Sequence, residues 1–156
     1  MNKQKNIETF KEFLAILAKR STCKKIKVAA LIVKEGRILS TGWNGAAPGL
    51  THCSDYFNST YPDIKNINPE EFSELHKTFS EKNELHAEAN AIAFAAKCGI
   101  SIAGAELYTT YSPCLGCAKL ILASGLKSVY YINKYDRSAD EAINLLKNVE
   151  VNVEQI

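Results

Sequence analysis

Helix-like and strand-like segments alternate along the second half of the chain, and this alternation constrains the fold more than any other feature of the sequence. The expected order is helix, strand, helix, strand, helix and strand, over residues 85–97, 105–110, 114–123, 127–132, 138–147 and 149–153. Gly99 and Gly125 follow the first two helices, as is typical of helix ends. Strands separated by helices favour parallel pairing, so this half predicts an α/β sandwich.

The first half begins with an expected helix over residues 9–20 and continues with a β-hairpin. In the run IKVAALIVKEGRILSTGWNG, two β-rich segments meet at residues 34–37, where Gly36 supplies the turn. Residues 45–83 then form a long polar stretch, in which only residues 69–79 predict a short helix. A stretch of this length is uncommon in a compact domain unless it is functional or held in place.

Size and composition predict one soluble domain over residues 1–156. The chain is 46% apolar and 23% charged, and its length is sufficient to bury a core without covalent cross-links. A net charge of +2 is too small to indicate a nucleic-acid-binding stripe, although the basic residues concentrate in the first 27 positions. The positive electrostatic potential of these basic residues could help a pocket to bind a small anion.

The N-terminal segment predicts an amphipathic helix that faces the core, because its apolar residues recur at helical spacing: Ile7, Phe10, Leu14 and Leu17. It lacks the unbroken apolar run of a signal peptide, and no segment indicates a membrane span. We therefore expect a cytoplasmic protein whose five cysteines are reduced. Clustered cysteines in that compartment favour metal binding or catalysis over disulfides.

Two short motifs carry the expected chemistry, His86-Ala87-Glu88 and Pro113-Cys114-Leu115-Gly116-Cys117. Each opens a predicted helix, and a helix N-terminus stabilises the thiolates that bind metal. His86, Cys114 and Cys117 supply three zinc ligands and leave a fourth position open, which is typical of a catalytic site. We expect water at that position, with a pKa lowered towards about 7 on zinc. Glu88 would then transfer protons as the catalytic acid and base.

Either motif alone is a weak signal. His-Ala-Glu is common, and a single Cys-x-x-Cys also occurs in redox and structural zinc sites. Together and in this order they favour a catalytic zinc site. The alternative is a non-catalytic zinc-binding assembly module, which gives Glu88 no role.

The chain resembles the cytidine deaminase superfamily, and within it the phage-type deoxycytidylate (dCMP) deaminases. The resemblance rests on STCKKIKVAALIVKEGRILSTGWNGAAPG, HCSDY, EKNELHAEANAIAFAAKCG, YTTYSPCLGCAKLILASGLKSVYY and KYD. It implies a three-layer α-β-α sandwich around a mixed five-stranded sheet. It also implies zinc-dependent hydrolysis of dCMP to dUMP and ammonia for thymidylate synthesis, in the host cytoplasm if the source is viral.

Three further site residues follow from the resemblance. The family's Gly-Tyr-Asn-Gly turn offers its Asn to the nucleotide, which implies that Asn44 binds substrate. On sequence alone, a simple turn at Asn44-Gly45 is the favoured interpretation, and the resemblance reverses it. The resemblance also implies that the Ala87 backbone contacts the pyrimidine and that Tyr135 contacts the phosphate; loop packing is the alternative for Tyr135.

The resemblance explains the long stretch of residues 45–83 through a second, structural zinc. It implies four ligands, Cys23, Cys53, His76 and Glu84. Such a site would tie residues 45–83, which we call the insert, to the end of the first helix. The free energy of zinc binding would offset the entropy lost when the insert becomes ordered. The alternative is that the cysteines are small buried residues and that His76 and Glu84 lie on a solvated helix face. His52 is the nearest rival ligand, and we expect Cys98 to be a small core residue.

The resemblance also implies assembly and regulation: family members usually form hexamers, and many are activated by dCTP and inhibited by dTTP, with Mg²⁺ accompanying the nucleotide effector. Trp43 replaces the usual tyrosine, Ala29-Ala30 replaces Gly-Ala, and Lys97 stands where arginine is common. These departures leave the response to effectors open.

Two other deaminase classes share motifs with this chain. The tRNA adenosine deaminases lack the insert and carry a more basic surface. Free-nucleoside cytidine deaminases normally have cysteine where His86 stands.

Overall fold

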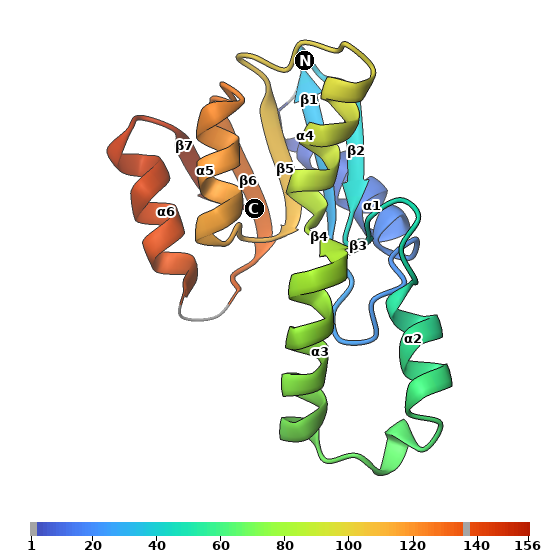
Figure 1. The fold of residues 1–156 in the computed structure, drawn as a ribbon. Coiled ribbons are helices and arrows are strands. Elements are labelled where there is room, and N and C mark those ends of the chain that lie inside the picture. The colour runs from blue at the N-terminus through green and yellow to red at the C-terminus, as the bar shows by residue number, and fades with distance from the viewer. Residues whose placement is uncertain (1–2, 136–137) are drawn as a thin grey trace.

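The computed structural model describes residues 3–135 and 138–156, and its core is a mixed five-stranded sheet (Figure 1). The strand order is β2-β1-β5-β6-β7, with β1 antiparallel to β2 and to β5, and with β5, β6 and β7 parallel. The strands span Ala29–Lys34, Arg37–Trp43, Glu106–Tyr111, Ser128–Asn133 and Asn152–Gln155, in the order β1, β2, β5, β6 and β7. The predicted parallel strands of the second half are therefore confirmed.

Helices cover both faces of the sheet. Helix α1 (Lys3–Ala18) buries Ile7, Phe10 and Leu14 against one face. Helices α4 (Ala87–Lys97), α5 (Leu115–Ala123) and α6 (Ser138–Asn148) form the layer on the other face. Strand β1 reads as an unbroken apolar run because alternate residues enter two separate cores. The expected three-layer α-β-α sandwich is confirmed.

A close backbone approach sets the position of α4 on the sheet. A Cβ atom on Gly42 of β2 would lie 2.2 Å from the carbonyl oxygen of Ala87 and 2.5 Å from the backbone nitrogen of Ala91. Only glycine fits there. On the same strand, the hydroxyl of Ser40 donates to the Ala91 carbonyl at 2.7 Å. These contacts position the start of α4, and with it His86 and Glu88.

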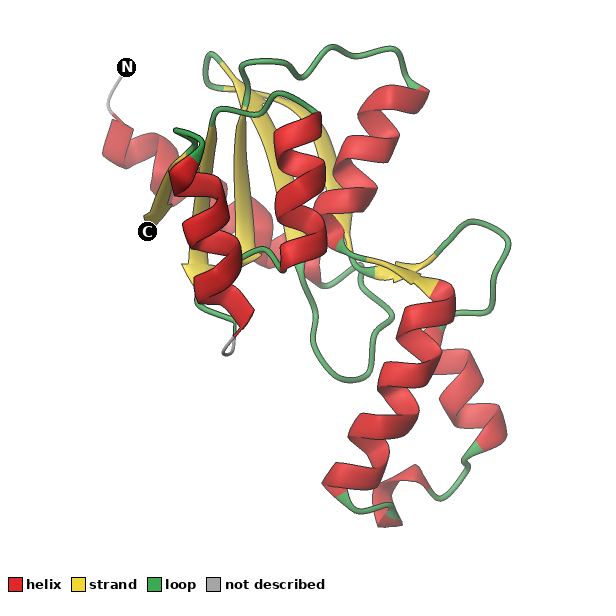
Figure 2. Cartoon of the chain, turned by 60° about the vertical axis from the view of Figure 1, so that its left-hand side comes forward, coloured by secondary structure: helices red, strands yellow, loops and turns green. Residues whose placement is uncertain are grey.

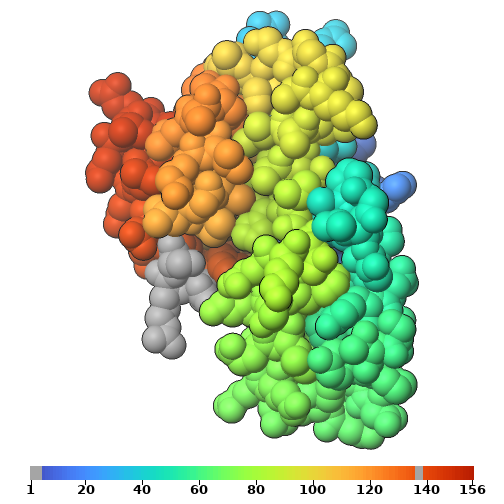
Figure 3. Space-filling model, in the orientation of Figure 1, coloured from blue at the N-terminus to red at the C-terminus, as the bar shows by residue number. Residues whose placement is uncertain are grey.

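The insert contains more helix than expected. Helix α2 (Cys53–Thr60), a 3₁₀ turn (Ile64–Asn66) and helix α3 (Pro69–Asn83) project from the sandwich as a separate lobe (Figures 2 and 3). Helix α3 was predicted in part, and it starts where Asn68 caps the Glu71 N–H at 2.8 Å. Helix α2 was not predicted.

The lobe has an aromatic core and a short ladder that joins it to the sandwich. Phe57 is fully buried, and its ring packs against those of Phe72 and Phe79. The ladder pairs β3 (Gly45–Ala46) with β4 (Glu84–Leu85), so both ends of the insert meet.

Other element boundaries differ slightly from expectation. Helix α1 begins six residues earlier than predicted, and β7 begins at Asn152 rather than at residue 149. A left-handed residue at Glu150, with φ of 64°, delays the strand. Cys98 was wrongly expected in the core: it follows the end of α4 and is exposed. None of the helices in the described ranges is long and apolar enough to cross a membrane.

Candidate active site and a second cluster of metal-ligand residues

The two sequence motifs meet in space at the start of two helices. His86 is the residue before α4, and Cys114 is the residue before α5. His86 Nδ1 lies 3.5 Å from Cys114 Sγ and 3.5 Å from Cys117 Sγ. The short strand before α4 (Glu84–Leu85) and the loop after β5 therefore bring together a histidine and a Cys-x-x-Cys pair separated by more than twenty residues.

This spacing fits one zinc ion. Zinc–sulfur bonds of about 2.3 Å and zinc–nitrogen bonds of about 2.0–2.1 Å at tetrahedral angles place ligand atoms roughly 3.6 Å apart. The observed separations of 3.5 Å agree with that value. Imidazole nitrogen and thiolate sulfur are also the donors that zinc prefers. His86, Cys114 and Cys117 are thus suited to hold zinc through three protein ligands.

The shifts in the pKa values of His86, Cys114 and Cys117 favour one negative charge shared among the three side chains. A hydrogen bond with Cys117, followed by one with His86, lowers the pKa of Cys114 to about 3. The Cys117 N–H also points at Cys114 Sγ from 3.5 Å, as expected at a helix N-terminus. The pKa of Cys117 is raised because its thiol bonds the Cys114 sulfur. The pKa of His86 is raised for the corresponding reason, its contact with Cys114.

Glu88 is the buried acid of the site. It lies in the first turn of α4, and only 4% of its surface is exposed. Burial raises the pKa of its carboxyl group, and an interaction with Cys117 places it beside the cysteine pair. A carboxyl group with a raised pKa next to metal-ligand residues is suited to accept and return a proton.

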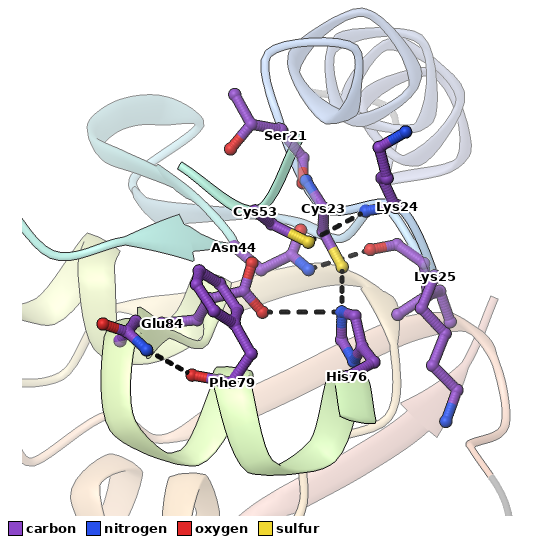
Figure 4. A network of polar contacts seen from close by, with 12 residues as sticks. Ser21, Cys23, Lys24, Lys25, Asn44, Cys53, His76, Phe79 and Glu84 are labelled. Carbon is purple, nitrogen blue, oxygen red and sulfur yellow. Dashed lines mark hydrogen bonds and ion pairs between the residues drawn. The ribbon is translucent and has the colours of Figure 1, made fainter. Parts of the chain in front are cut away.

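Four more metal-ligand residues converge between the lobe and the sandwich. Cys23 follows α1, Cys53 begins α2, His76 is in α3 and Glu84 follows α3. Figure 4 shows these four side chains pointing toward one another. Their ligand atoms all lie within 4.8 Å of one another.

Individual contacts within this second cluster are close to ligand spacing. His76 Nε2 lies 3.1 Å from Cys23 Sγ and 3.8 Å from Glu84 Oε2. A hydrogen bond with Cys53 lowers the pKa of Cys23 to about 4, whereas the pKa of Cys53 is raised. Burial raises the pKa of Glu84, and its Oε1 atom is buried without a hydrogen-bond partner. A buried orphaned carboxylate oxygen beside a thiolate indicates that a cation fits here.

One cleft of about 910 Å³ connects the two clusters. Its lining includes His86, Glu88 and Cys114 at one cluster and Cys23, His76 and Glu84 at the other. It also includes all three residues expected to bind substrate: Asn44, Ala87 and Tyr135.

Asn44 has a structural role that the sequence did not reveal. Its Oδ1 accepts from the Val28 N–H at 2.8 Å, and its Nδ2 donates to the Ile26 carbonyl at 2.8 Å. Each of these groups has capacity for a second hydrogen bond. Asn44 therefore holds the segment before β1 in place and can still face the cleft.

The other expected residues differ in their surroundings. Ala87 is fully buried, while Tyr135 is 38% exposed and its N–H donates to Ser112 Oγ at 2.8 Å. Asp136 of the KYD segment lies outside the described residues. His52 is exposed, with Nδ1 at 3.5 Å from Thr22 Oγ1, and does not belong to the second cluster.

Several cleft-lining residues were missed in the sequence. Ser73, Lys77 and Lys25 line the cleft from α3 and from the loop after Cys23. Isolated lysines and serines carry no motif. The available signal was helical spacing, because Ser73, His76 and Lys77 fall on one face of a helix.

Comparisons with known proteins agree with this geometry. The family model "Cytidine and deoxycytidylate deaminase zinc-binding region" matches residues 4–133. Deoxycytidylate deaminase of Enterobacteria phage T4 is 38% identical over 160 residues, which cover 88% of this chain and 83% of the phage protein. ComE operon protein 2 of Bacillus subtilis is 36% identical over 90% of this chain and 66% of its own length.

Solved structures extend the comparison. The dCMP deaminase of cyanophage S-TIM5, in complex with dCMP and dUMP, superposes with a TM-score of 0.76 at 34% identity, covering 100% of this chain and 99% of the cyanophage chain. A tRNA:A34 deaminase has a TM-score of 0.53 at 16% identity, covers 92% of this chain and 91% of its own, and shares the fold alone. The matched motifs, the extent of the match and the phage relatives lead to one conclusion: the chain belongs to the cytidine and deoxycytidylate deaminase family.

Proposed function

We propose that this chain is a zinc-dependent dCMP deaminase, which hydrolyses dCMP to dUMP and ammonia. The observation that carries the proposal is the convergence of His86, Cys114 and Cys117 beside the buried carboxyl group of Glu88, at the wall of a large cleft. The phage relatives that match most of the chain bear the name deoxycytidylate deaminase. This name favours dCMP as the substrate over other compounds that carry an amino group.

The chemistry divides between metal and protein. A zinc ion held by His86, Cys114 and Cys117 would lower the pKa of a water molecule and supply a nucleophile near neutral pH. Glu88 accepts a proton from the attacking water and delivers protons to the pyrimidine ring nitrogen and to the departing amine. The new C–O bond replaces the C–N bond at the ring carbon, and ammonia leaves. Burial raises the pKa of the Glu88 carboxyl group, which favours its protonated form.

Other residues orient the nucleotide in this proposal. Asn44 faces the cleft from the turn after β2, Ala87 lies at the start of α4, and Tyr135 follows β6. Because Asn44 is fixed by two backbone contacts, its remaining hydrogen-bonding capacity has a defined direction. A fixed partner of this kind binds substrate without a further ordering cost.

A second, structural zinc is also proposed at Cys23, Cys53, His76 and Glu84. Support comes from the donor set, from the 3.1 Å and 3.8 Å separations around His76, and from the orphaned Glu84 oxygen. That ion would join the segment after α1, the start of α2, and the middle and C-terminal end of α3. Bound there, it would stabilise the lobe, whose core is small.

Assembly and regulation remain proposals of the same kind. We expect a cytoplasmic homo-oligomer, with a hexamer favoured, and regulation by dCTP and dTTP with Mg²⁺. The support for these expectations is the family alone.

The proposal is tested by a substrate panel on the zinc-loaded protein. Ammonia release is measured with dCMP, dCTP, CMP, deoxycytidine and a tRNA anticodon stem, each with and without added dCTP as effector. We expect dCMP to give the highest kcat/KM. A higher value for the tRNA stem or for deoxycytidine would replace dCMP as the assigned substrate.

A further inference from the structure

Helix α4 contains an asparagine, Asn90, in a sequence that is otherwise rich in alanine. Asparagine is among the less favourable residues for a helix interior, because its side chain competes for backbone hydrogen bonds. Here the side chain reaches outside its own helix: Nδ2 donates to the backbone carbonyl of Trp43 at 2.9 Å, across 47 positions of sequence. A residue that local preference disfavours, and that makes a long-range contact, indicates that the contact has a role.

The contact from α4 reaches the last residue of β2, immediately before Asn44. We call residues 43–46 the Asn44 turn. The close approach between Gly42 and Ala87 brings this end of β2 against α4, so the Trp43 carbonyl is within reach of the helix. Because the acceptor is a backbone atom, the hydrogen bond fixes the path of the chain. The Trp43 ring has a separate partner, the guanidinium group of Arg20, which lies 4.9 Å from the ring centroid.

The Asn44 turn is held from three directions. Toward β1, the Asn44 N–H donates to the Val28 carbonyl at 3.1 Å. Toward the lobe, Gly45 pairs with Leu85 in the β3–β4 ladder. Toward α4, the contact is the one from Asn90. This third contact differs from the other two because it joins the turn directly to the helix that carries the proposed proton-transfer group.

Opposite sides of α4 serve the two functions. Glu88 and Asn90 are two positions apart, which corresponds to a rotation of about 200° around the helix axis. Glu88 and Asn44 are among the described residues that line the cleft, whereas Asn90 and Trp43 are not among them. Asn90 can therefore affect a nucleotide in the cleft through the position of the Asn44 turn, and not by touching it.

We propose that Asn90 is a positioning residue, which sets the place of Asn44 relative to Glu88 and thereby aligns the nucleotide with the group that transfers protons. This inference rests on the proposed function, in which Asn44 orients the nucleotide. Without the Asn90 amide, the Trp43 carbonyl loses its donor and the Asn44 turn is free to move away from α4. Small displacements of an orienting group are costly at a catalytic site, because the reacting atoms must be held in a narrow range of geometries.

The first test measures hydrogen–deuterium exchange in the zinc-loaded protein without any nucleotide. Asn90→Ala removes the donor, and exchange of the backbone amides of residues 43–46 rises about 5- to 10-fold, as expected for the loss of one hydrogen bond. Exchange in β5 and β6 changes by less than about twofold, which separates local release of the turn from general destabilisation. Asn90→Asp keeps the shape of the side chain but turns an acceptor toward the Trp43 carbonyl, so exchange rises at least as much.

The second test is a double-mutant cycle on binding of the product dUMP, measured by calorimetry. Asn90→Ala weakens dUMP binding about 10-fold when Asn44 is present. In the Asn44→Ala background the same substitution weakens binding by less than about twofold, because the contact that Asn90 positions is already absent. A residue with a merely structural role would weaken binding equally in both backgrounds. The exchange test remains decisive even where Asn44→Ala does not fold.

Gln155→Ala is the matched control. The Gln155 side chain makes the same kind of bond, from Nε2 to the backbone carbonyl of Ile132 at 3.0 Å, at an exposed position of β7 outside the cleft. Its removal leaves dUMP binding and the exchange of residues 43–46 unchanged. Elemental analysis shows unchanged zinc in Asn90→Ala, which separates the position of the turn from loss of metal.

The outcomes separate this inference from the proposed function. If the wild type neither binds dUMP nor deaminates dCMP, the proposed function fails and the alignment of a nucleotide fails with it, whatever the exchange result. If the wild type is active, the positioning role alone is overturned by unchanged exchange of residues 43–46 in Asn90→Ala. Unchanged dUMP affinity in Asn90→Ala, or an equal loss with and without Asn44, overturns it as well.

Discussion

Glu84 and His86 are separated by one residue, yet their side chains join two different clusters. Glu84 Oε2 lies 3.8 Å from His76 in the second cluster, whereas His86 Nδ1 lies 3.5 Å from Cys114 in the first. Between them, Leu85 pairs with Gly45 in the β3–β4 ladder. Residues two positions apart in an extended segment project from the same face, and Glu84 and His86 both line the cleft that connects the two clusters. The segment therefore links the lobe to the candidate active site.

The second cluster predicts the metal content. Wild-type protein should carry two zinc ions per chain, and Cys53→Ala should carry one because a buried ligand is lost. We expect the variant to lose about 4 kcal/mol or more of stability, or roughly 8–16 °C in Tm. Elemental analysis and thermal unfolding provide the measurements.

Cys98→Ala is the matched control for that substitution. Cys98 is exposed after α4 and belongs to neither cluster, so both zinc ions and the Tm should be retained. A single zinc in carefully prepared wild-type protein would contradict the second site.

Glu88→Gln should retain zinc and fold normally but lose activity. The amide keeps the shape of the side chain and removes the group that accepts and returns protons. We expect kcat for dCMP to fall by about 100- to 10,000-fold. Glu141→Gln, at an exposed position of α6, makes the same change away from the cleft and should leave kcat unaltered. Unchanged turnover in Glu88→Gln would remove the catalytic assignment.

The sandwich and the first cluster could be predicted because their signals are local. Periodicity and helix-ending glycines mark the helices and strands of the second half. His86 precedes α4 and Cys114 precedes α5, and these two helices lie on the same face of the sheet. The lobe was harder to predict. Helix α2 is rich in residues that favour turns, and it is held by packing of Phe57 against rings from α3.

The residues of α3 that line the cleft were hard to predict for the same reason. Ser73 and Lys77 are ordinary residues of a polar helix, and their sequence spacing does not tell which face meets solvent. Only the position of the lobe beside the sandwich turns that face toward the candidate active site. Long-range packing, rather than local preference, decides which residues a cleft contains.

Gly42→Ala should destabilise the protein and displace the catalytic helix. Its new Cβ atom would overlap backbone atoms of Ala87 and Ala91, which cannot move aside as a flexible side chain could. We expect a loss of about 1–3 kcal/mol or more, together with lower kcat, because α4 carries Glu88. The control is Gly45→Ala, where the nearest atom lies 3.6 Å away. Chemical denaturation and dCMP turnover distinguish the two variants.

Zinc binding to the metal-free protein should release protons at pH 7. Cys114 and Cys23 are already thiolates because their pKa values are lowered to about 3 and about 4, whereas the raised pKa values of Cys117 and Cys53 keep those thiols protonated. Both must ionise to bind metal, and His86, whose pKa is raised, must also be neutral. At least about one proton therefore leaves each cluster, and affinity rises with pH. Calorimetry in buffers of different ionisation enthalpy measures this release. A binding enthalpy independent of the buffer would contradict it.

Asn44→Asp should separate the structural role of this residue from its proposed contact with substrate. The carboxylate can still accept from the Val28 N–H, but it cannot donate to the Ile26 carbonyl, and two acceptors then face each other at a distance now spanned by a 2.8 Å hydrogen bond. We expect a loss of about 1–3 kcal/mol of stability. Asn58→Asp, at an exposed position of α2, controls for the added charge.

The kinetics of Asn44→Asp carry the second half of this prediction. Segment 26–28 lines the cleft through Ile26 and Val28, so its displacement should raise KM for dCMP even at temperatures where the variant is fully folded. The new negative charge also repels a nucleotide phosphate, and this part of the effect should weaken as salt is added. If KM is unchanged while stability falls, Asn44 is a scaffold for the loop and makes no contact with substrate.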